Sequence, residues 1–391
     1  MEEKAMRPNH HHRFFFIFTG LVLLLNLGLP VIHAQVSLDG TLGSSGALSG
    51  PDYRIGADLG KQSGSNLFHS FSQFNINTDE TATFTGPGTV SNIISRVTGG
   101  SGSWIDGALR SEIPGANLYL LNPRGVMFGP NASLDIGGAF HVTTADYLHL
   151  GDNGRFDAAF PENSVLTTAA PSAFGFLADE PSGIGVEGYL NVSEGQTLSL
   201  TGGNIEITGG QLTAQSGHIN IASVASPGEL VPSDAGFDIS AFERHGEISL
   251  SGGALLNVSG NSAGDIHIRG GRFLISDSDS AVVSMTGYGD GGGIDIETSR
   301  DLAVINGATI FTETLAEGRA GDIRLAADNM GVVGGAVYSQ NSNGTGAGDT
   351  GNISASANSL FITGGGTVFT DTVGAGRGGN VTADTVYTEL S

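Results

Sequence analysis

The pentapeptide Gly264-Asp265-Ile266-His267-Ile268 returns, with changes at its polar positions, throughout the second half of this chain. Its two isoleucines are separated by one polar residue, the period-two pattern of a short strand buried on one face. Six other segments share the pattern: Gly203-Asn204-Ile205-Glu206-Ile207, Gly217-His218-Ile219-Asn220-Ile221, Gly246-Glu247-Ile248-Ser249-Leu250, Gly293-Ile294-Asp295-Ile296, Gly321-Asp322-Ile323-Arg324-Leu325 and Gly351-Asn352-Ile353-Ser354. The starting glycines follow one another at two short intervals and otherwise at a nearly constant longer one.

Further strand-like pieces lie between these copies, among them Leu302-Ala303-Val304-Ile305, Ala308-Thr309-Ile310-Phe311-Thr312 and Leu360-Phe361-Ile362. The longer interval, about 29 residues with three short strands and glycine-rich corners, is typical of a solenoid in which each repeat is one coil. The sequence therefore predicts an all-β fold, a parallel β-helix, which we expect to be right-handed because parallel crossovers nearly always are. The alternative, a β-sandwich of hairpins, gives no reason for one pentapeptide to return at coil length.

Composition excludes several classes of protein. There are 39 acidic and 16 basic residues, a net charge of −23, so the chain lacks the basic surface that a nucleic-acid partner needs. The chain is 39% hydrophobic and 14% charged, which is not the composition of a disordered polymer. There is no cysteine, so the fold must be stable without disulfides.

Residues 1–34 have the composition of a leader. Basic residues precede an apolar run over residues 14–25, and the segment ends in Val31-Ile32-His33-Ala34. This order predicts a secretory signal peptide that is removed after Ala34. A membrane anchor is the alternative, but Asn26 and Pro30 interrupt an apolar run that is already short for a bilayer.

Phenylalanines recur at every third position in the segment Asn66-Leu67-Phe68-His69-Ser70-Phe71-Ser72-Gln73-Phe74-Asn75-Ile76. The spacing predicts a tight turn followed by a strand that covers apolar surface. We expect the phenylalanines to plug the open N-terminal end of the solenoid.

A second distinct segment, Asn122-Pro123-Arg124-Gly125, stands between two apolar strands. Asparagine at the first position, proline at the second and glycine at the fourth are typical of a β-turn. Arginine at the third position tolerates a positive φ poorly, which favours type I over type II.

With the leader and the coil repeat, these segments resemble the N-terminal secretion domain of filamentous haemagglutinin-like exoproteins, the passengers of two-partner secretion. Asn122-Pro123-Arg124-Gly125-Val126 is similar to the family's Asn-Pro-Asn-Gly-Ile turn, and 66–76 to its early segment ending in Phe-Asn-Val. The segments 195–203 and 223–229 also resemble family signatures. The family's Asn-Pro-Asn-Leu turn is missing near residues 86–90.

The resemblance implies a domain organisation. Residues 1–34 are the signal peptide, residues 35–250 are the secretion domain, a β-helix with an N-terminal cap and extra-helical hairpins, and residues 251–391 are β-helix repeats. No polar cap is recognisable at Leu390-Ser391, so we expect the chain to be truncated at this end.

The resemblance also implies a function. The passenger crosses the periplasm unfolded, and an outer-membrane barrel transporter captures its N-terminal segment with periplasmic domains. The protein is then secreted or held at the surface of a Gram-negative-type cell, as an adhesin that binds a glycan or protein receptor on another cell. No cofactor is implied. We expect capture to involve Asn66, Phe68, Phe71, Phe74 and Asn75. We expect the turn Asn122, Pro123, Arg124 and Gly125 to set the fold of the domain, with recognition secondary.

The rival function is a β-helix enzyme that degrades polysaccharides. Its chemistry needs carboxylates held on one face, and the candidates are Asp265, Asp295 and Asp322. We expect each to occupy the same slot of its own coil, as solvated ladder positions would, and therefore expect no catalysis. The glycine-rich segment 287–295 resembles a calcium loop but occurs once, and the histidines share no ligand spacing, so no metal site is expected.

Overall fold

The computed structural model describes residues 35–233, 236–342, 344 and 348–391. The expected signal peptide, residues 1–34, lies outside the described residues. Within them almost all regular structure is strand, apart from two short 3₁₀ helices, η1 (Ala57–Leu59) and η2 (Pro161–Asn163), and the strands belong to one compact unit. The described part of the chain contains no helix long and apolar enough to span a membrane.

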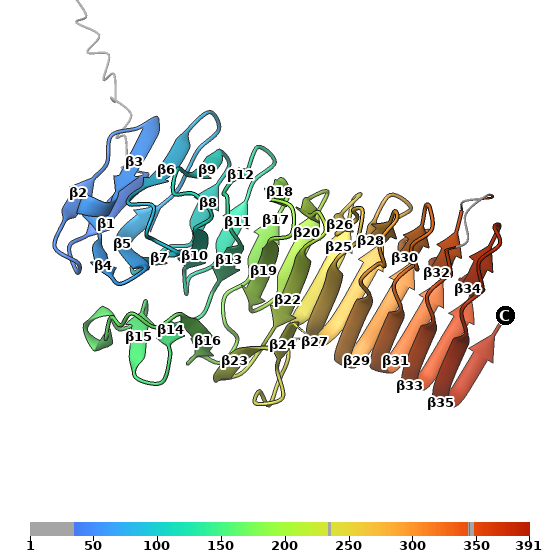
Figure 1. Cartoon of the computed structure of the whole chain (residues 1–391). Coiled ribbons are helices and arrows are strands. Elements are labelled where there is room, and N and C mark those ends of the chain that lie inside the picture. Colours follow the sequence, from blue (N-terminus) through green and yellow to red (C-terminus); the bar gives the residue numbers. More distant parts are fainter. Residues whose placement is uncertain (1–34, 234–235, 343, 345–347) are drawn as a thin grey trace, which may run out of the picture. The chain divides into compact units, whose positions relative to one another are not determined.

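Two long sheets form the walls of a coil that advances along the chain (Figure 1). The larger one has 19 strands: β1 (Val36–Asp39), β2 (Ser45–Ala47), β4 (Lys61–Ser63), β5 (Asn66–Phe74), β7 (Asn92–Val97), β8 (Ser103–Ile105), β10 (Asn117–Leu121), β11 (Val126–Phe128), β13 (Phe140–Thr143), β17 (Ile184–Val186), β19 (Thr197–Gly202), β20 (Ile205–Thr208), β22 (His218–Ser223), β25 (Glu247–Ser251), β27 (Asp265–Ser276), β29 (Ile294–Ile305), β31 (Ile323–Val333), β33 (Ile353–Thr363) and β35 (Val381–Leu390).

The second sheet has 11 strands, all paired in parallel: β3 (Asp52–Gly56), β6 (Thr81–Thr85), β9 (Ala108–Ser111), β12 (Ser133–Asp135), β18 (Tyr189–Val192), β21 (Gln211–Ala214), β26 (Leu255–Asn257), β28 (Ala281–Thr286), β30 (Thr309–Thr314), β32 (Ala336–Asn341) and β34 (Thr367–Thr372). We call this sheet face 1. The predicted parallel β-helix is confirmed.

The larger sheet provides two faces of each coil. Face 2 contains β5, β7, β10, β13, β19, β22 and the first halves of the strands from β27 onward, and face 3 contains β8, β11, β17, β20, β25 and the second halves of those strands. From β27 onward one strand crosses both faces, with a register irregularity in the middle, as between Glu297 and Asp301 of β29. The later coils therefore have two strands each, where the sequence predicted three.

The repeat of the pentapeptide is explained by these faces. The copies that begin at Gly203 and Gly246 lie on face 3, in β20 and β25, whereas the other five lie on face 2. The two short intervals arise because they compare copies from different faces, and the nearly constant intervals after Gly264 are true coil lengths. Isoleucines such as Ile266 and Ile268 point inward and are fully buried in the common core.

Glycine is required where successive coils touch at the corner before face 2. A Cβ on Gly321 would lie 1.7 Å from the carbonyl oxygen of Gly292, and one on Gly351 would lie 1.8 Å from that of Gly321. No side chain is compatible with such distances, so the corner needs glycine in each coil.

Antiparallel strands cover the N-terminal end of the coil. The edge of β5 that faces away from β7 pairs with β4 at one end and with β1 at the other, and β1 also pairs with β2. Pairing removes an edge strand that would otherwise expose its backbone groups. The expected N-terminal cap is therefore built mainly from backbone pairing, and Phe71 and Phe74 of β5 lie in the coil core beside it.

A third, antiparallel sheet leaves the coil and lies against face 2. Its strands are β14 (Tyr147–Leu150), β15 (Gly154–Asp157), β16 (Pro171–Phe176), β23 (Gly228–Ser233) and β24 (Gly236–Asp238), inserted after β13 and after β22. Between this extra-helical sheet and face 2 is a second apolar core, which includes Phe68, Leu148, Phe156, Phe174 and Phe237. The first coils are thus buried on both sides of face 2.

Candidate functional site

The capture segment expected from the sequence, residues 66–75, forms one continuous strand with the start of the next loop. Leu67 and Phe71 point into the coil, whereas Phe68 points outward and packs on Phe156 of β15 with ring centroids 5.0 Å apart. A bulge at Ser72 then returns Phe74 to the inside, because Leu38 pairs with Phe71 but Ser37 pairs with Gln73. The spacing at every third position therefore marks a bulged strand whose phenylalanines lie on both sides, and the predicted tight turn is wrong.

Four of the five expected contact residues are buried in the folded chain. Asn66, Phe68 and Phe71 are 0% exposed and Phe74 is 1% exposed. Asn75 is half-buried, and its side-chain oxygen accepts a hydrogen bond of 2.8 Å from the backbone N–H of Trp104. A partner could touch the apolar members of this set only before the first coils fold.

Asn66 begins a ladder of asparagines, in which Asn66 and Asn92 are buried and Asn117 is half-buried. Asn92 Nδ2 donates to Asn66 Oδ1 at 2.9 Å, Asn117 Nδ2 donates to Asn92 Oδ1 at 3.1 Å, and Asn117 Oδ1 accepts from the backbone of Ala139 at 2.9 Å. Asn66 Nδ2 donates to the carbonyls of Thr167 and Ala169, at 3.1 and 2.7 Å, in the loop between β15 and β16. The ladder fastens the extra-helical sheet to the first strand of face 2.

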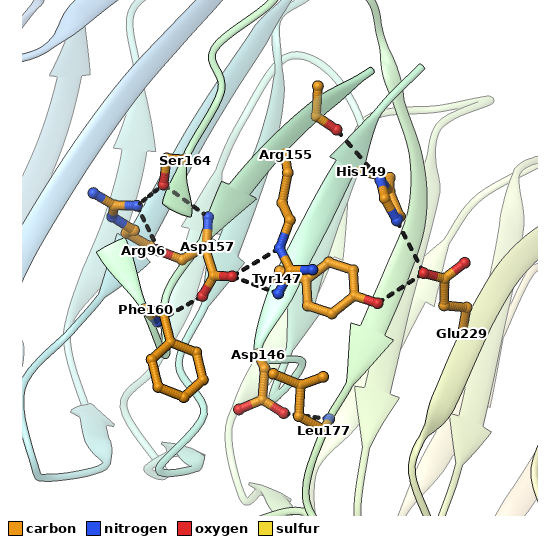
Figure 2. A network of polar contacts seen from close by, with 11 residues as sticks. Arg96, Asp146, Tyr147, His149, Arg155, Asp157, Phe160, Ser164, Leu177 and Glu229 are labelled. Carbon is orange, nitrogen blue, oxygen red and sulfur yellow. Dashed lines mark hydrogen bonds and ion pairs between the residues drawn. The ribbon is translucent and has the colours of Figure 1, made fainter. Parts of the chain in front are cut away.

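Arg96 of β7 is the centre of a buried polar network that joins three parts of the chain. Figure 2 shows its contacts with Asp157 and Ser164. Its side chain is 1% exposed, and the guanidinium lies over the ring of Phe156, 4.3 Å from the centroid. Nε donates to Ser70 Oγ at 2.7 Å, Nη1 donates to Ser164 Oγ and to the carbonyl of Asp157, and Nη2 donates to Thr41 Oγ1 at 2.9 Å. Arg96 therefore ties the cap, the first coils and the extra-helical sheet together.

Asp39 is the acidic partner of this centre. Burial raises the pKa of its carboxyl group, but hydrogen bonds from Ser70, Thr41 and Thr98 outweigh burial and leave the pKa below its usual value. Burial lowers the pKa of Arg96 to about 10, although Asp39 and Asp157 act in the opposite direction. Both groups are therefore charged at neutral pH, and they are connected through the hydroxyl groups of Ser70 and Thr41.

The network continues across the extra-helical sheet. Arg155 is paired with the buried carboxylate of Asp157, with Nε 2.7 Å from Oδ2, and stacks on the ring of Tyr147 (Figure 2). Tyr147 donates to Glu229 Oε1 at 2.7 Å, and the same oxygen lies 2.9 Å from His149 Nε2. Burial and the bond to Glu229 raise the pKa of Tyr147 to about 12. Strands β14, β15 and β23 are thereby locked in one arrangement.

The segment Asn122-Pro123-Arg124-Gly125 is the expected turn. Gly125 N–H donates to Asn122 O at 3.0 Å, and Asn122 Oδ1 accepts from the backbone of Arg124 at 2.9 Å. The positive φ of 100° falls on Gly125 rather than on Arg124, which agrees with the predicted type I turn. Asn122 is buried and donates to Ser103 Oγ at 3.0 Å, and Pro123 O accepts from Ser182 Oγ at 2.8 Å. The turn is thus hydrogen-bonded to Ser182, which lies between β16 of the extra-helical sheet and β17 of the coil.

A groove of about 570 Å³ runs beside this turn. Its walls include Pro123, Arg124, Phe160 and Leu177, and the half-buried carboxylate of Asp146 lies within it. Burial raises the pKa of Asp146, although the backbone N–H of Leu177 and the charge of Arg124 oppose the change (Figure 2). Arg124 is the one member of the turn motif that is exposed to solvent.

The three carboxylates considered for catalysis have structural partners. Asp265 and Asp322 occupy equivalent corners, where each accepts a backbone N–H of the next coil, from Gly293 at 2.7 Å and from Asn352 at 2.6 Å. Asp295 is paired in register with His267, so it lies two positions further along, and the expectation of one shared slot is wrong. It forms an ion pair of 2.9 Å with the buried Arg269. These carboxylates support the coil.

The glycine-rich segment 287–295 is a coil corner between β28 and β29, where Asp290 Oδ1 accepts the backbone N–H of Arg319 at 3.1 Å. No group of three or more histidine, aspartate or glutamate side chains that could hold a metal ion occurs among the described residues. His218 instead pairs with Asp265, and His267 with Asn220.

Sequence reasoning missed Arg96 and most of the asparagine ladder. The ladder could have been predicted from a repeat of asparagine followed by two large apolar residues, one coil apart: Asn66-Leu67-Phe68, Asn92-Ile93-Ile94 and Asn117-Leu118-Tyr119. The role of Arg96 could not be predicted from neighbouring residues, because its partners Ser164 and the Asp157 carbonyl lie much later in the chain.

The fold is a capped β-helix whose first coils carry an antiparallel sheet on one face. The family model described as the TPS secretion domain matches residues 34–268. The chain therefore belongs to the TPS secretion domain family. It carries the two-partner secretion domain of a filamentous haemagglutinin-like passenger, a domain that an outer-membrane transporter recognises, and members of this non-enzymatic family pass through the periplasm to be secreted.

Two solved structures are similar to this chain. The HMW1 secretion domain from Haemophilus influenzae is 17% identical, with 92% of this chain and 98% of that chain covered and a TM-score of 0.48. A filamentous hemagglutinin secretion domain is 13% identical, with 84% and 89% covered and a TM-score of 0.25. No curated protein matches this chain.

Proposed function

We propose that the transporter captures this passenger by the strand Asn66–Phe74 and the adjoining Asn75 while that segment is unfolded. The proposal rests on one observation, the complete burial of Asn66, Phe68 and Phe71 in the folded chain. An extended segment with large apolar side chains on both faces suits addition to the edge of a sheet in a periplasmic capture domain. Folding would then remove the segment from the transporter, because the same backbone edges pair with β1, β4 and β7.

This mechanism gives export a direction without nucleotide hydrolysis. Before folding, Phe68 is available to the transporter, and after folding it lies between face 2 and Phe156. A coil formed outside the cell cannot slide back through a narrow barrel, and each further coil needs only the previous one as a template.

The test separates recognition from folding. A peptide covering residues 64–78 should bind the purified periplasmic domains of the transporter, and the same peptide with Phe68→Ser and Phe71→Ser should bind at least about tenfold more weakly, a loss of about 1.4 kcal/mol. In cells, deletion of residues 66–76 should leave the passenger in the periplasm. Arg96→Ala is the matched control, since it damages the fold but keeps the capture segment, and its unfolded chain should still be captured. Equal binding by the two peptides would refute the assignment.

For the turn we propose a role in folding, with recognition secondary. Asn122 and Pro123 anchor it to Ser103 and Ser182, and Arg124 alone faces solvent. Asn122→Ala with Pro123→Ala should lower both the melting temperature and the secretion rate, whereas Arg124→Ala should change neither appreciably. If the double variant secretes and melts like the unaltered protein, the turn is an ordinary loop.

We further propose that the mature protein, after removal of residues 1–34, is an adhesin held at the cell surface or released, with a secretion domain over 35–250 and a presenting β-helix over 251–391. The outward positions of face 2 in the later coils are polar, with His267, Asp295 and Arg324 in register, and such columns could bind a glycan or a protein on another cell. Binding of the purified protein to cells and to a glycan array, compared with a version ending at residue 250, tests this role. Equal binding by both versions would contradict it.

A further inference from the structure

The outward column of face 3 changes from polar to apolar in the later coils. In β20 and β25 it holds Glu206 and Ser249. In β27, β29, β31 and β33 parallel pairing continues the column with four residues that lack a polar side chain: Leu274, Ala303, Gly331 and Phe361. The neighbours of this column along the strands, such as Leu302 and Val304, are buried in the coil core, so the column points away from the core.

A second apolar row widens this column into a patch. Ile305 and Val333 lie two positions further along β29 and β31, on the same outward side, and Val333 is 40% exposed. Among the described residues, no strand lies over this part of face 3. A contiguous apolar surface of this kind marks an interaction site. We call six residues the face 3 patch: Leu274, Ala303, Ile305, Gly331, Val333 and Phe361.

Gly331, at the centre of the patch, is a glycine that the fold of the chain does not require. It lies inside β31 and has no positive φ. A Cβ at this position would meet nothing closer than Val333 Cγ2, at the ordinary contact distance of 3.9 Å, whereas a Cβ on Gly321 would collide with a backbone carbonyl. A glycine inside a strand weakens it and often marks a place where another backbone approaches closely. Gly331 therefore indicates a close contact from outside the chain.

We propose that the face 3 patch is the interface of a weak dimer, in which a second copy of this chain packs on it with its coil axis antiparallel. The two-fold axis lies between the two sheets, parallel to the strands, at the level of Gly331. Phe361 of each copy then faces Ala303 of the other, because both residues lie one coil away from Gly331. A large side chain meets a small one in both halves of the interface, which is the self-complementarity that a two-fold dimer needs.

The polar column beside the patch is compatible with this arrangement. It contains, in register, Arg272, Asp301, Asn329, Ser359 and Tyr387. The antiparallel axis places Asn329 opposite itself and Asp301 opposite Ser359. It places Arg272 opposite Tyr387, so no two like charges meet. A dimer with parallel coil axes would instead place the carboxylate of Asp301 opposite Ile305, where it would lose its hydration without gaining a partner.

The size of the patch sets the expected affinity. Four strands at about 4.8 Å and five residues at about 3.3 Å cover roughly 300 Å² per copy, which is small for a specific interface. We therefore expect a dissociation constant on the order of 0.1 mM. Sedimentation equilibrium of the purified full-length protein between about 0.01 and 0.5 mM should show a reversible monomer–dimer equilibrium.

A pair of opposite charges tests which residues face each other. Ala303→Asp and Phe361→Lys should each weaken self-association by about tenfold or more, because each places a charge against an apolar surface. An equimolar mixture of the two variants should dimerise at least about tenfold more tightly than either variant alone, since the new carboxylate of one copy then faces the new ammonium group of the other. Ser354→Lys is the matched control, because it places the same charge at an exposed position of β33 on face 2 and should leave the dimer unchanged.

Three results would overturn the proposal. One is a monomer throughout the concentration range for the unaltered protein, a measurement that requires no variant and stands even if a variant fails to fold. Another is a dimer of unchanged affinity in Ala303→Asp and Phe361→Lys variants that retain the far-UV circular dichroism spectrum, which would assign self-association to a different surface. The third is a mixture of these folded variants that associates no more tightly than each variant alone.

Discussion

The coils before and after residue 250 have the same backbone architecture but are held together differently. In the earlier coils, face 2 is covered by the extra-helical sheet, and a second apolar core with a buried arginine lies between them. Beyond β27 no described strand covers the outer faces, and stacked glycines at the corners bring successive coils into contact.

The two regions differ in the sequence separation of the residues that their side-chain hydrogen bonds join. Some side-chain hydrogen bonds of the earlier coils join residues far apart, 103 positions for Asn66 with Ala169 and 68 for Arg96 with Ser164. Among the described residues beyond 250, such bonds span no more than a single coil, 29 positions for Arg319 with Asp290 and 30 for Asn352 with Asp322. The earlier coils must therefore fold as a unit, whereas the later ones can be added one at a time.

The largest expected effect of a single substitution is that of removing the buried arginine. Arg96→Ala leaves Asp39 without its cation and the Asp157 carbonyl without a donor, which should lower the free energy of unfolding of the earlier coils by about 3–5 kcal/mol. The single tryptophan, Trp104 in β8, reports this transition during urea unfolding by its fluorescence. Arg319→Ala is the control, because its exposed pair with Asp322 should contribute no more than about 1 kcal/mol. Equal losses in the two variants would remove the distinction between the two regions.

Acid should weaken the earlier coils selectively. Burial lowers the pKa of His69 and of His141 from 6.5 to about 4, so between these values the unfolded chain binds protons that the folded chain does not. The free energy of unfolding should therefore fall as the pH is lowered from about 6.5 to about 4, by on the order of 3 kcal/mol for each histidine. The sequence contains no histidine after His267.

The acid effect is measured by hydrogen exchange at several pH values. Amides of β5 and β13 should lose protection, after correction for intrinsic exchange rates, before those of β31 and β33. His69→Leu together with His141→Phe, which keeps a ring on Tyr119, should remove most of this pH dependence. Simultaneous loss of protection in both regions would show that the histidines are not its cause.

A change at a corner glycine should affect only the later coils. Gly321→Ala places a methyl group against the carbonyl of Gly292 and should cost about 1–3 kcal/mol in local stability. Exchange in β29, β31 and β33 should accelerate while the Trp104 transition stays in place. Gly378→Ala is the matched control, since no atom lies within 4 Å of its added Cβ. A shift of the Trp104 midpoint in the Gly321 variant would mean that the two regions unfold together.

The smallest expected effect is the difference in stability lost when a buried and an exposed asparagine ladder are interrupted. Asn92→Ala leaves Asn66 Oδ1 and Asn117 Nδ2 without their buried partner, and should cost about 1–3 kcal/mol in urea unfolding. Asn352→Ala interrupts the exposed ladder between Asp322 and Asn380, where water replaces the lost bonds, and should cost less than about 0.5 kcal/mol. A comparable cost at both positions would mean that burial does not distinguish the ladders.

The sequence predicted what depends on local pattern. Alternation of Ile266 and Ile268 with polar residues identified the inward face of a coil strand, and the order of Asn122, Pro123 and Gly125 identified a type I turn. Both inferences succeed because strand pleating and turn geometry are set within a few residues.

The features that could not be predicted from the sequence depend on tertiary contacts between distant parts of the chain. The outward direction of Phe68 depends on strand register, and its burial depends on Phe156, which lies far along the chain in β15. The bulge at Ser72, which makes phenylalanine at every third position compatible with a strand, depends on pairing with β1. The partners of Arg96 come from the cap and from the extra-helical sheet, and their order in the sequence gives no sign that they meet.

We infer that the capture strand β5 becomes buried only when the extra-helical sheet folds over it. Pulse-labelling hydrogen exchange during refolding of the full chain, read by mass spectrometry, measures the order of these two events. Peptides covering 66–74 and 147–176 should gain protection in the same kinetic phase. Full protection of 66–74 in an earlier phase, while 147–176 still exchanges freely, would contradict it.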